Sequence, residues 1–299
     1  MVGWFGKAAV AAAGLCFLAT SVPAQITDPS KGEQKCQSSV GGTSAKFVGS
    51  KSKCIQSCIS AKRKAMATDY TGCLPKCTVG GCAPMIPTSY SDPTANTCIF
   101  DTVKGAEAKA GTSVAKACNN VKVTDDKCPE CYSAAQCSVS GALNPWVQTT
   151  EGDIDAPFGG AQLAAFPRLI YCVETGGATP GKDEAKCEDG VSKALVKFVG
   201  AKNKCYAKCL SSAYKSGAGR GVCLPPNPVD PGVNTCIKDP VKGAEAKAIA
   251  AITKACPTPP SCSSYGTNFA ANFVSSVESA VDTRAPQISC GSPSGAFLQ

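Results

Sequence analysis

Three cysteines in the first half of the chain recur 151 residues later together with their surroundings. Cys36, Cys54 and Cys58 return as Cys187, Cys205 and Cys209. The sequence KFVG recurs at 46–49 and 197–200, and VKGAEAKA recurs at 103–110 and 241–248. Such self-similarity indicates a repeated structural unit. The chain is therefore predicted to consist of two copies of one cysteine-rich unit.

The composition indicates that these units need covalent support. Of the 299 residues, 43% are hydrophobic but only 6% are aromatic. Small apolar side chains bury little area each, at roughly 25 cal/mol per Å². The 21 cysteines can supply what such a core lacks. This density of cysteine is typical of disulfide-bonded domains in an oxidising compartment.

The first 24 residues have the pattern of a secretory leader. A short segment with one basic residue, Lys7, precedes the apolar run 8–20, and Val22-Pro23-Ala24 matches a cleavage site. The run is too short to span a membrane as a helix. Removing Cys16 with the leader leaves 20 cysteines, an even number. We expect a secreted protein, extracellular or periplasmic, with all its thiols paired.

The mature chain divides into segments with distinct patterns. A polar lead, 25–35, precedes repeat A, 36–172. A Gly- and Pro-containing linker, 173–186, separates it from repeat B, 187–290, and 291–299 form a tail. We predict a mostly all-α fold, in which each repeat is a small helical bundle stapled by disulfides and repeat A carries irregular inserts.

Repeat B shows three helical patterns. The first places Val191, Leu195 and Phe198 on one face, with lysines on the others. The second is expected to start at Asp239-Pro240, an N-cap residue followed by proline, and to end at Cys256. The third begins at Phe269 and ends before Pro286. Gly105 and Gly243 would then lie within the second helix of each repeat, where glycine costs about 1 kcal/mol relative to alanine, which suggests a packing reason.

Repeat A differs from repeat B in two inserts and in its third segment. One insert carries Cys77 and Cys82, the other Cys128 and Cys131. Prolines and a Gly-Gly pair predict that 144–167 is irregular where repeat B has its third helix. The aromatic residues of this segment form the candidate interaction surface: Trp146, Phe158 and Phe166.

The alignment of the repeats sorts the cysteines, which we expect to be structural and paired. Eight positions are shared: Cys36/Cys187, Cys54/Cys205, Cys58/Cys209, Cys73/Cys223, Cys98/Cys236, Cys118/Cys256, Cys137/Cys262 and Cys172/Cys290. Four more are found in repeat A alone: Cys77, Cys82, Cys128 and Cys131. Because both sets are even, each repeat is expected to close on its own cysteines.

Helix geometry predicts part of the connectivity. The segments 187–205 and 236–256 would be helices of about 27 and 30 Å at 1.5 Å per residue. Packed antiparallel, they bring Cys187 to Cys256, and Cys36 to Cys118 in repeat A. Cys205 and Cys209 share a helix face, so one would bond Cys236 and the other Cys223. Cys262 and Cys290 would then close the third helix.

The chain contains no histidine, which excludes Ser-His-Asp and Cys-His mechanisms. The motif Cys128-Pro129-Glu130-Cys131 has the spacing of redox and zinc sites. No strand–helix alternation surrounds it, and secreted cysteines are mostly paired. We therefore expect structural disulfides, no catalytic residue, no bound metal and no cofactor.

The formal net charge of +8 draws such a protein to anionic surfaces, although lysines also simply solvate helices. No aromatic residues alternate with the lysines, so no specific nucleic-acid partner is expected. Our leading hypothesis is a non-enzymatic binding or structural protein associated with anionic surface polymers or with another secreted protein. Alternatives are an inhibitor-like or toxin-like effector acting through the repeat A insert, and a thiol oxidoreductase using Cys128 and Cys131.

Overall fold

The computed structural model describes residues 30–67, 69–75, 90–119, 127–129, 131–155, 170–171, 181–216, 220–225, 230–259 and 268–290. Within these ranges every regular element is a helix, which confirms the predicted all-α class. No helix among them is both long and apolar enough to cross a membrane. The predicted leader, residues 25–29 of the polar lead, residues 173–180 of the linker and the tail lie outside the described residues.

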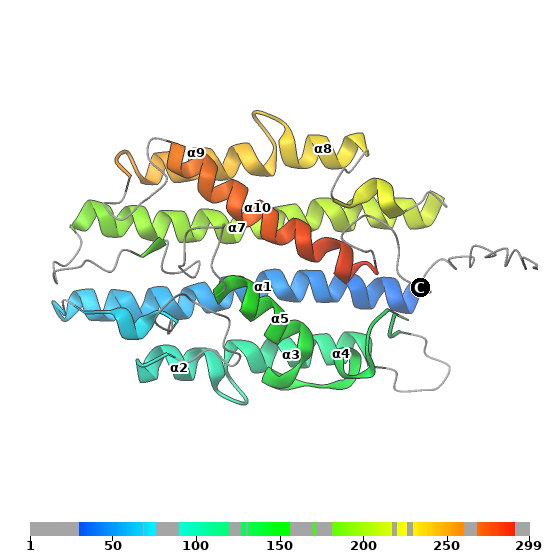
Figure 1. Cartoon of the computed structure of the whole chain (residues 1–299), viewed down its shortest axis with the longest axis horizontal. Coiled ribbons are helices and arrows are strands. Elements are labelled where there is room, and N and C mark those ends of the chain that lie inside the picture. Colours follow the sequence, from blue (N-terminus) through cyan, green and yellow to red (C-terminus); the bar gives the residue numbers. More distant parts are fainter. Residues whose placement is uncertain are drawn as a thin grey trace, which may run out of the picture.

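Two long helices form the centre of the fold, α1 (Lys31–Lys64) and α7 (Lys182–Ser216), each at the start of a predicted repeat. They lie side by side and run antiparallel (Figure 1). The other elements of the first half are η1 (Thr71–Cys73), α2 (Pro93–Phe100), α3 (Ala106–Cys118), α4 (Ala134–Ser138), η2 (Gly141–Leu143) and α5 (Pro145–Asp155). Those of the second half are η3 (Arg220–Cys223), α8 (Pro231–Lys238), α9 (Ala244–Ala255) and α10 (Phe269–Ile288).

The helices form two layers. In the first, α2 and α3 flank α1 on one side, and α8 and α9 flank α7 on the other (Figure 1). The second layer consists of α5 and α10, which cross obliquely over the central pair. One large hydrophobic cluster takes residues from both repeats, including Phe47 and Ile55 of α1 and Leu195 and Phe198 of α7. The two repeats therefore share a core.

The ends of the central helices are paired across the interface in a two-fold pattern. Arg63 at the end of α1 donates to Glu188 near the start of α7. At the other end, the Tyr214 hydroxyl of α7 donates to Gln37 of α1 at 2.9 Å. Tyr214 lies 151 positions after Arg63, and Gln37 lies 151 positions before Glu188. The repeats thus meet like the subunits of a two-fold dimer, in which the same two surface positions meet twice.

The start predicted for the second helix of repeat B, at Asp239-Pro240, was wrong. Asp239 ends α8, and α9 begins at Ala244 with Gly243 as its N-cap. The Asp-Pro start occurs one helix earlier, where Asp92 and Asp230 accept backbone N–H bonds at the beginning of α2 and α8. Asp239 instead accepts N–H bonds from the turn that follows it.

Gly105 and Gly243 therefore lie at helix N-caps and not within helices. A Cβ atom at Gly105 would lie 2.4 Å from the Asp101 carbonyl oxygen. The same atom at Gly243 would lie 2.5 Å from the Asp239 carbonyl oxygen. The packing reason is a tight turn between consecutive helices, which leaves no room for a side chain.

The third segment of repeat A was predicted to be irregular over 144–167, and this prediction is wrong for its first part. Residues 145–155 form the helix α5, and Pro145 is its first residue, a position that proline favours. α5 crosses α1 as α10 crosses α7 (Figure 1). It is therefore the shorter counterpart of α10. In repeat B, α10 continues through Pro286 to Ile288, past the end that was predicted before Pro286.

The disulfides agree with the helix-hairpin geometry. Cys36–Cys118, Cys54–Cys98 and Cys58–Cys73 in repeat A match Cys187–Cys256, Cys205–Cys236 and Cys209–Cys223 in repeat B. The predicted pairings Cys36–Cys118 and Cys187–Cys256 are confirmed, and Cys205 and Cys209 take the two partners proposed for them.

The expectation that each repeat closes on its own cysteines is wrong. Cys131 in the repeat A insert is bonded to Cys290 at the end of α10, across 159 residues of sequence. Cys290 therefore does not pair with Cys262, and Cys128 pairs with Cys137. The cause is that α10 crosses the central pair and ends over repeat A. Cys77, Cys82, Cys172 and Cys262 lie outside the described residues.

Candidate functional site

Of the predicted interaction surface, the structure describes only Trp146, which is not on the surface. It is 5% exposed, lies in α5 and packs against Tyr132 with ring centroids 4.9 Å apart. The prediction of an exposed Trp146 is therefore corrected. Phe158 and Phe166 lie outside the described residues.

The Cys128-Pro129-Glu130-Cys131 motif does not form a bond between its own cysteines. Its two sulfurs are joined to Cys137 and Cys290. A dithiol oxidoreductase needs the two motif cysteines to exchange with each other. In this structure they instead hold the insert to α4 and to the end of α10.

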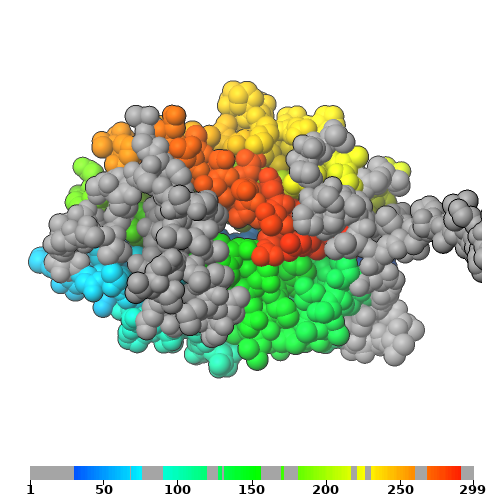
Figure 2. Space-filling model, in the orientation of Figure 1, coloured from blue at the N-terminus to red at the C-terminus, as the bar shows by residue number. Residues whose placement is uncertain are grey.

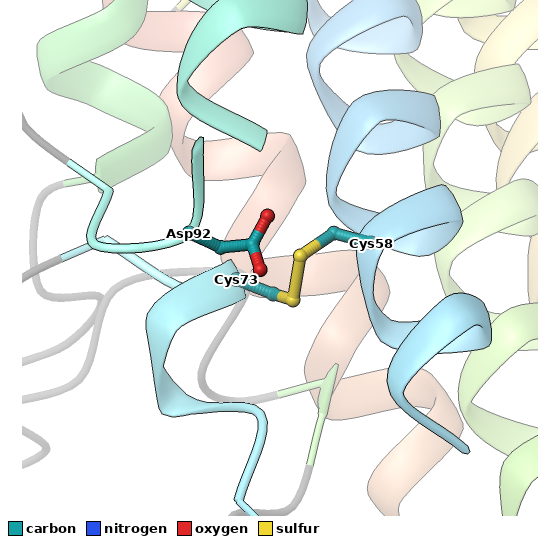
Figure 3. Close-up of side chains that lie close together, drawn as sticks. All are labelled: Cys58, Cys73 and Asp92. Carbon is teal, nitrogen blue, oxygen red and sulfur yellow. A yellow bond between two sulfur atoms is a disulfide. The ribbon is translucent and has the colours of Figure 1, made fainter. Parts of the chain in front are cut away.

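Cys58, Cys73 and Asp92 form a compact group with the ligand types of a metal site (Figure 3). The two sulfurs are bonded to each other, so neither is available as a thiolate ligand. The Asp92 carboxylate caps α2 by accepting hydrogen bonds from the backbone N–H groups of Thr94 and Ala95. Its other oxygen lies 3.0 Å from the Lys62 ammonium. This group is thus structural.

Each repeat buries one lysine against two carboxylates, which sequence reasoning missed. In repeat A, Lys51 of α1 is 0% exposed, and its ammonium lies 2.8 Å from Glu151 and 2.6 Å from Asp155 of α5. In repeat B, Lys202 of α7 lies 2.7 Å from Glu278 and 2.6 Å from Asp282 of α10.

A sequence signal for these clusters existed. Lys51 and Lys202 are 151 positions apart, and the pattern Glu-x-x-x-Asp occurs once in α5 and once in α10. Residues at i and i+4 share one helix face, so both carboxylates of each pair reach the same lysine. The signal also identifies α5 as the counterpart of α10.

The repeat A cluster holds an extra proton. Burial and a hydrogen bond with Glu151 raise the pKa of Glu107, a residue of α3, to about 9. Burial favours the neutral amine of Lys51, but Tyr90, Asp155 and Glu151 outweigh it and raise its pKa above the ordinary value. Lys51 therefore stays charged, which makes it a poor nucleophile or base.

In repeat B a second cation neutralises the carboxylates of the corresponding cluster. Lys238 stands where repeat A has Phe100, and its ammonium lies 3.1 Å from Glu245 and 2.8 Å from Glu278. Burial raises the pKa of Glu278, but hydrogen bonds from Lys202 and Lys238 outweigh burial and lower this pKa below its ordinary value. The repeat A cluster is enclosed, whereas Lys238 at the edge of the repeat B cluster is 51% exposed. Both clusters hold a helix of the second layer to a central helix.

The feature directed at solvent is a pair of lysine stripes on the central helices. Besides Lys182 at its first position, α7 carries six exposed lysines that follow one another at intervals of seven and four residues: Lys186, Lys193, Lys197, Lys204, Lys208 and Lys215. In α1 four exposed lysines occupy the corresponding positions: Lys35, Lys46, Lys53 and Lys64. At 3.6 residues per turn each stripe falls within an arc of about 60° and the longer one extends about 43 Å.

Both stripes point away from the second layer. On α1, Ser44 and Val48 face α5 and α10, and on α7 Leu195 and Val199 do so. The lysines lie roughly opposite to these residues on each helix. Because α1 and α7 are neighbours, the ten lysines form one surface, which we call the lysine face.

The lysine face is almost free of negative charge and of apolar groups. The sequence has no Asp or Glu between 34 and 64, nor between 190 and 216. None of the ten lysines forms an ion pair with another described residue. The exposed large hydrophobic side chains of the described chain are Met66, Val103, Leu143 and Val241, none of them in α1 or α7.

No protein-family model, curated protein or solved structure matches the chain.

Proposed function

We propose that the chain is a secreted, non-enzymatic binding protein that attaches to a linear acidic polysaccharide through the lysine face. The observation that carries this proposal is the alignment of ten exposed lysines on two adjacent helices that have no acidic residue over 34–64 and 190–216. A one-sign surface of this kind creates a potential that attracts polyanions. The pattern of disulfides and the leader-like N-terminus support an extracellular setting.

The chemistry of the face favours a polysaccharide over other polyanions. Nucleic-acid binders of single strands add aromatic side chains for base stacking, and this face has none exposed. Peripheral membrane helices add apolar side chains that enter the bilayer, which are absent as well. The lysine ammonium is a single charge on a flexible side chain, without the planar two-point geometry of arginine. It therefore suits sulfates and carboxylates that are spaced along a flexible polymer.

The alternatives have less support. An effector surface around Trp146 would need that ring exposed, and it is buried. A thiol oxidoreductase would need Cys128 and Cys131 to pair with each other, and they do not.

The test compares two variants of equal net charge. One replaces four lysines of the face, Lys193, Lys197, Lys204 and Lys208, with glutamine. The control replaces four exposed lysines of α3 and α9, Lys109, Lys116, Lys247 and Lys254, in the same way. Affinity for heparin and for polygalacturonate is measured by titration between 50 and 300 mM salt.

We expect the face variant to bind at least about tenfold more weakly than the control, with a smaller salt dependence. Equal losses in the two variants would show a mere net-charge effect and would overturn the proposal. Tighter binding to a DNA duplex or to anionic phosphatidylglycerol vesicles than to either polysaccharide would also overturn it, in favour of that partner.

A further inference from the structure

One disulfide of the described chain joins the two repeats. Cys131 in the repeat A insert is bonded to Cys290, which follows the last turn of α10. The other described bonds each stay within one repeat. Figure 2 shows the end of α10 (red) lying against residues of repeat A (green). The Cys131–Cys290 bond, which we call the strap, ties this end of α10 to the other repeat.

The two cysteines of the strap differ in their access to solvent. Cys131 is half-buried, whereas Cys290 is 7% exposed. In four of the described bonds both cysteines are buried: Cys36–Cys118, Cys58–Cys73, Cys187–Cys256 and Cys209–Cys223. Exchange with an external thiol requires access to one of the two sulfurs. The strap offers this access at Cys131.

The buried sulfur of the strap accepts a hydrogen bond. The side-chain amide of Gln37 in α1 donates to Cys290 Sγ at 3.2 Å. The Tyr214 hydroxyl of α7 donates to the other end of this amide, its carbonyl oxygen, and so orients the NH₂ group toward the sulfur. A hydrogen bond donated to a thiolate favours the charged form. Because a stabilised thiolate leaves faster in exchange, Cys290 is the leaving sulfur of this bond.

The opposite end of the central pair shows what is particular about Gln37. The positions that correspond to Gln37 and Tyr214 are occupied there by Glu188 and Arg63, which form an ion pair. A carboxylate has no N–H to donate and would repel a thiolate. The neutral amide of Gln37 is therefore the partner that suits a sulfur on which negative charge develops.

The backbone at Cys290 is held in an unfavourable conformation. Its φ is 60°, in the left-handed region, which is costly for a residue that has a Cβ atom. Helices often end in this conformation, but the residue there is usually glycine. A strained residue of this kind persists only where the surrounding structure holds it. Cleavage of the strap lets Cys290 leave this conformation, which favours the reduced state.

Two other described bonds have an exposed cysteine but lack these further features. They are Cys54–Cys98 and Cys205–Cys236, in which Cys98 and Cys236 are exposed. No described residue donates a hydrogen bond to their sulfurs, and the φ angles of these cysteines are negative. They are therefore internal controls, equally open to a reductant but without a prepared leaving sulfur.

We infer that the strap is a reducible switch, which a dithiol reductant opens by attack on Cys131. One thiolate of the reductant forms a bond to Cys131 Sγ, and the electron pair of the broken bond leaves on Cys290 Sγ. The second thiolate of the reductant then attacks the first reductant sulfur and releases Cys131 as a thiolate. The reductant loses two electrons and becomes a disulfide, and its two protons end on Cys131 and Cys290.

Opening the strap frees the end of α10 without untying either repeat. The three corresponding disulfides of each repeat stay closed. The end of α10 then depends on noncovalent contacts with repeat A. These include the Tyr132 hydroxyl, which donates to the Ile288 carbonyl oxygen at 2.5 Å, and the ion pair of Arg284 with Asp153. Such contacts break and re-form, so the switch converts a fixed helix end into one that opens and closes.

The rate at which each bond is reduced tests this inference. The mature protein is treated with limiting dithiothreitol near neutral pH, samples are quenched with iodoacetamide, and the modified cysteines are mapped by mass spectrometry. We expect the strap to open at least about tenfold faster than Cys54–Cys98 and Cys205–Cys236. Hydrogen exchange in the last turn of α10 should then increase, while circular dichroism shows that the helix content is retained.

Three variants examine the role of the hydrogen bond. Gln37→Met has a similar size but no donor, and should slow opening of the strap about fivefold without changing the rates of the two control bonds. Tyr214→Phe keeps Gln37 but removes the group that orients it, and should slow opening to a smaller extent. Glu188→Gln alters the corresponding position at the other end of the central pair and should leave the rate as in wild type.

Three results would overturn the inference: a control bond that opens as fast as the strap, an unchanged rate in Gln37→Met, or unchanged hydrogen exchange in α10 after the strap has opened. Thermal unfolding checks that each variant is folded. If Gln37→Met does not fold, Tyr214→Phe takes its place, and a rate equal to wild type in that variant overturns the inference.

Discussion

Replacing Glu107 with glutamine should make this protein less sensitive to pH, and more stable at pH 8. Glu107 is 4% exposed, and burial together with its hydrogen bond to Glu151 raises its pKa from the ordinary value of 4.5 to about 9. Between these two values the folded state binds one proton that the unfolded state has released. The stability therefore falls as the pH rises from about 4.5 to about 9.

The size of the effect follows from proton linkage. One proton bound only in the folded state gives a slope of about 1.4 kcal/mol per pH unit. From pH 6 to pH 8 the wild-type free energy of unfolding should fall by about 3 kcal/mol. Glutamine can donate to Glu151 through its amide and has no proton to lose, so the Glu107→Gln variant should lack this slope.

The composition makes the measurement clean. The chain contains no histidine, the side chain that ordinarily titrates in this range. Guanidinium unfolding followed by circular dichroism at pH 5 to 8.5, at constant ionic strength and with disulfides intact, gives the curve. The matched control is Glu245→Gln, the corresponding position in repeat B, where Lys238 supplies the counter-charge.

The control should retain the wild-type slope, because Glu107 is still present, and lose less than about 1 kcal/mol from a partly exposed ion pair. A wild-type stability that does not change between pH 6 and 8 would refute the reasoning. So would a Glu107→Gln curve that runs parallel to the wild type.

Three further changes test the supports of the fold by chemical or thermal denaturation. Lys51→Met should lower the free energy of unfolding by about 3–5 kcal/mol, because it strands two carboxylates that are each 2% exposed, and a loss no larger than that of Lys202→Met would contradict this. Replacing both Cys131 and Cys290 with serine should cost about 2–4 kcal/mol, and mass mapping of unreduced wild-type peptides should recover this bond; its absence would show that the repeats are not cross-linked. Gly105→Ala should lower the stability by about 2 kcal/mol, since its Cβ would meet a carbonyl oxygen at 2.4 Å, and a melting temperature equal to wild type would contradict the tight turn.

The local disulfides could be predicted from sequence because helices convert sequence separation into distance. Cys205 and Cys209 are one helical turn apart, so they can reach two successive elements of the returning chain, α8 and η3. The Cys131–Cys290 bond could not be obtained in this way. It depends on α10 crossing from its own repeat onto the other, and no spacing along the chain records that crossing.

The helix α5 was missed because proline was taken as a breaker and not as a first residue. Pro145 begins the helix, and Asn144 holds the turn before it through the Trp146 N–H at 3.0 Å. The pairing of Lys51 with Glu151 and Asp155 could have revealed the helix, since the same three residue types recur in repeat B. Lysines are rarely buried, so neither lysine was predicted to lie in the core, although Lys202 follows Leu195 by seven residues on the same helix face.

A duplicated scaffold suits the lysine face. Solubility alone is served by mixed charges, so solvation does not explain two helices that avoid acidic residues over more than 25 positions each. A polymer-binding face gains from repetition, because each copy adds lysines to the same surface. Lysines at four corresponding positions of α1 and α7 fit this expectation.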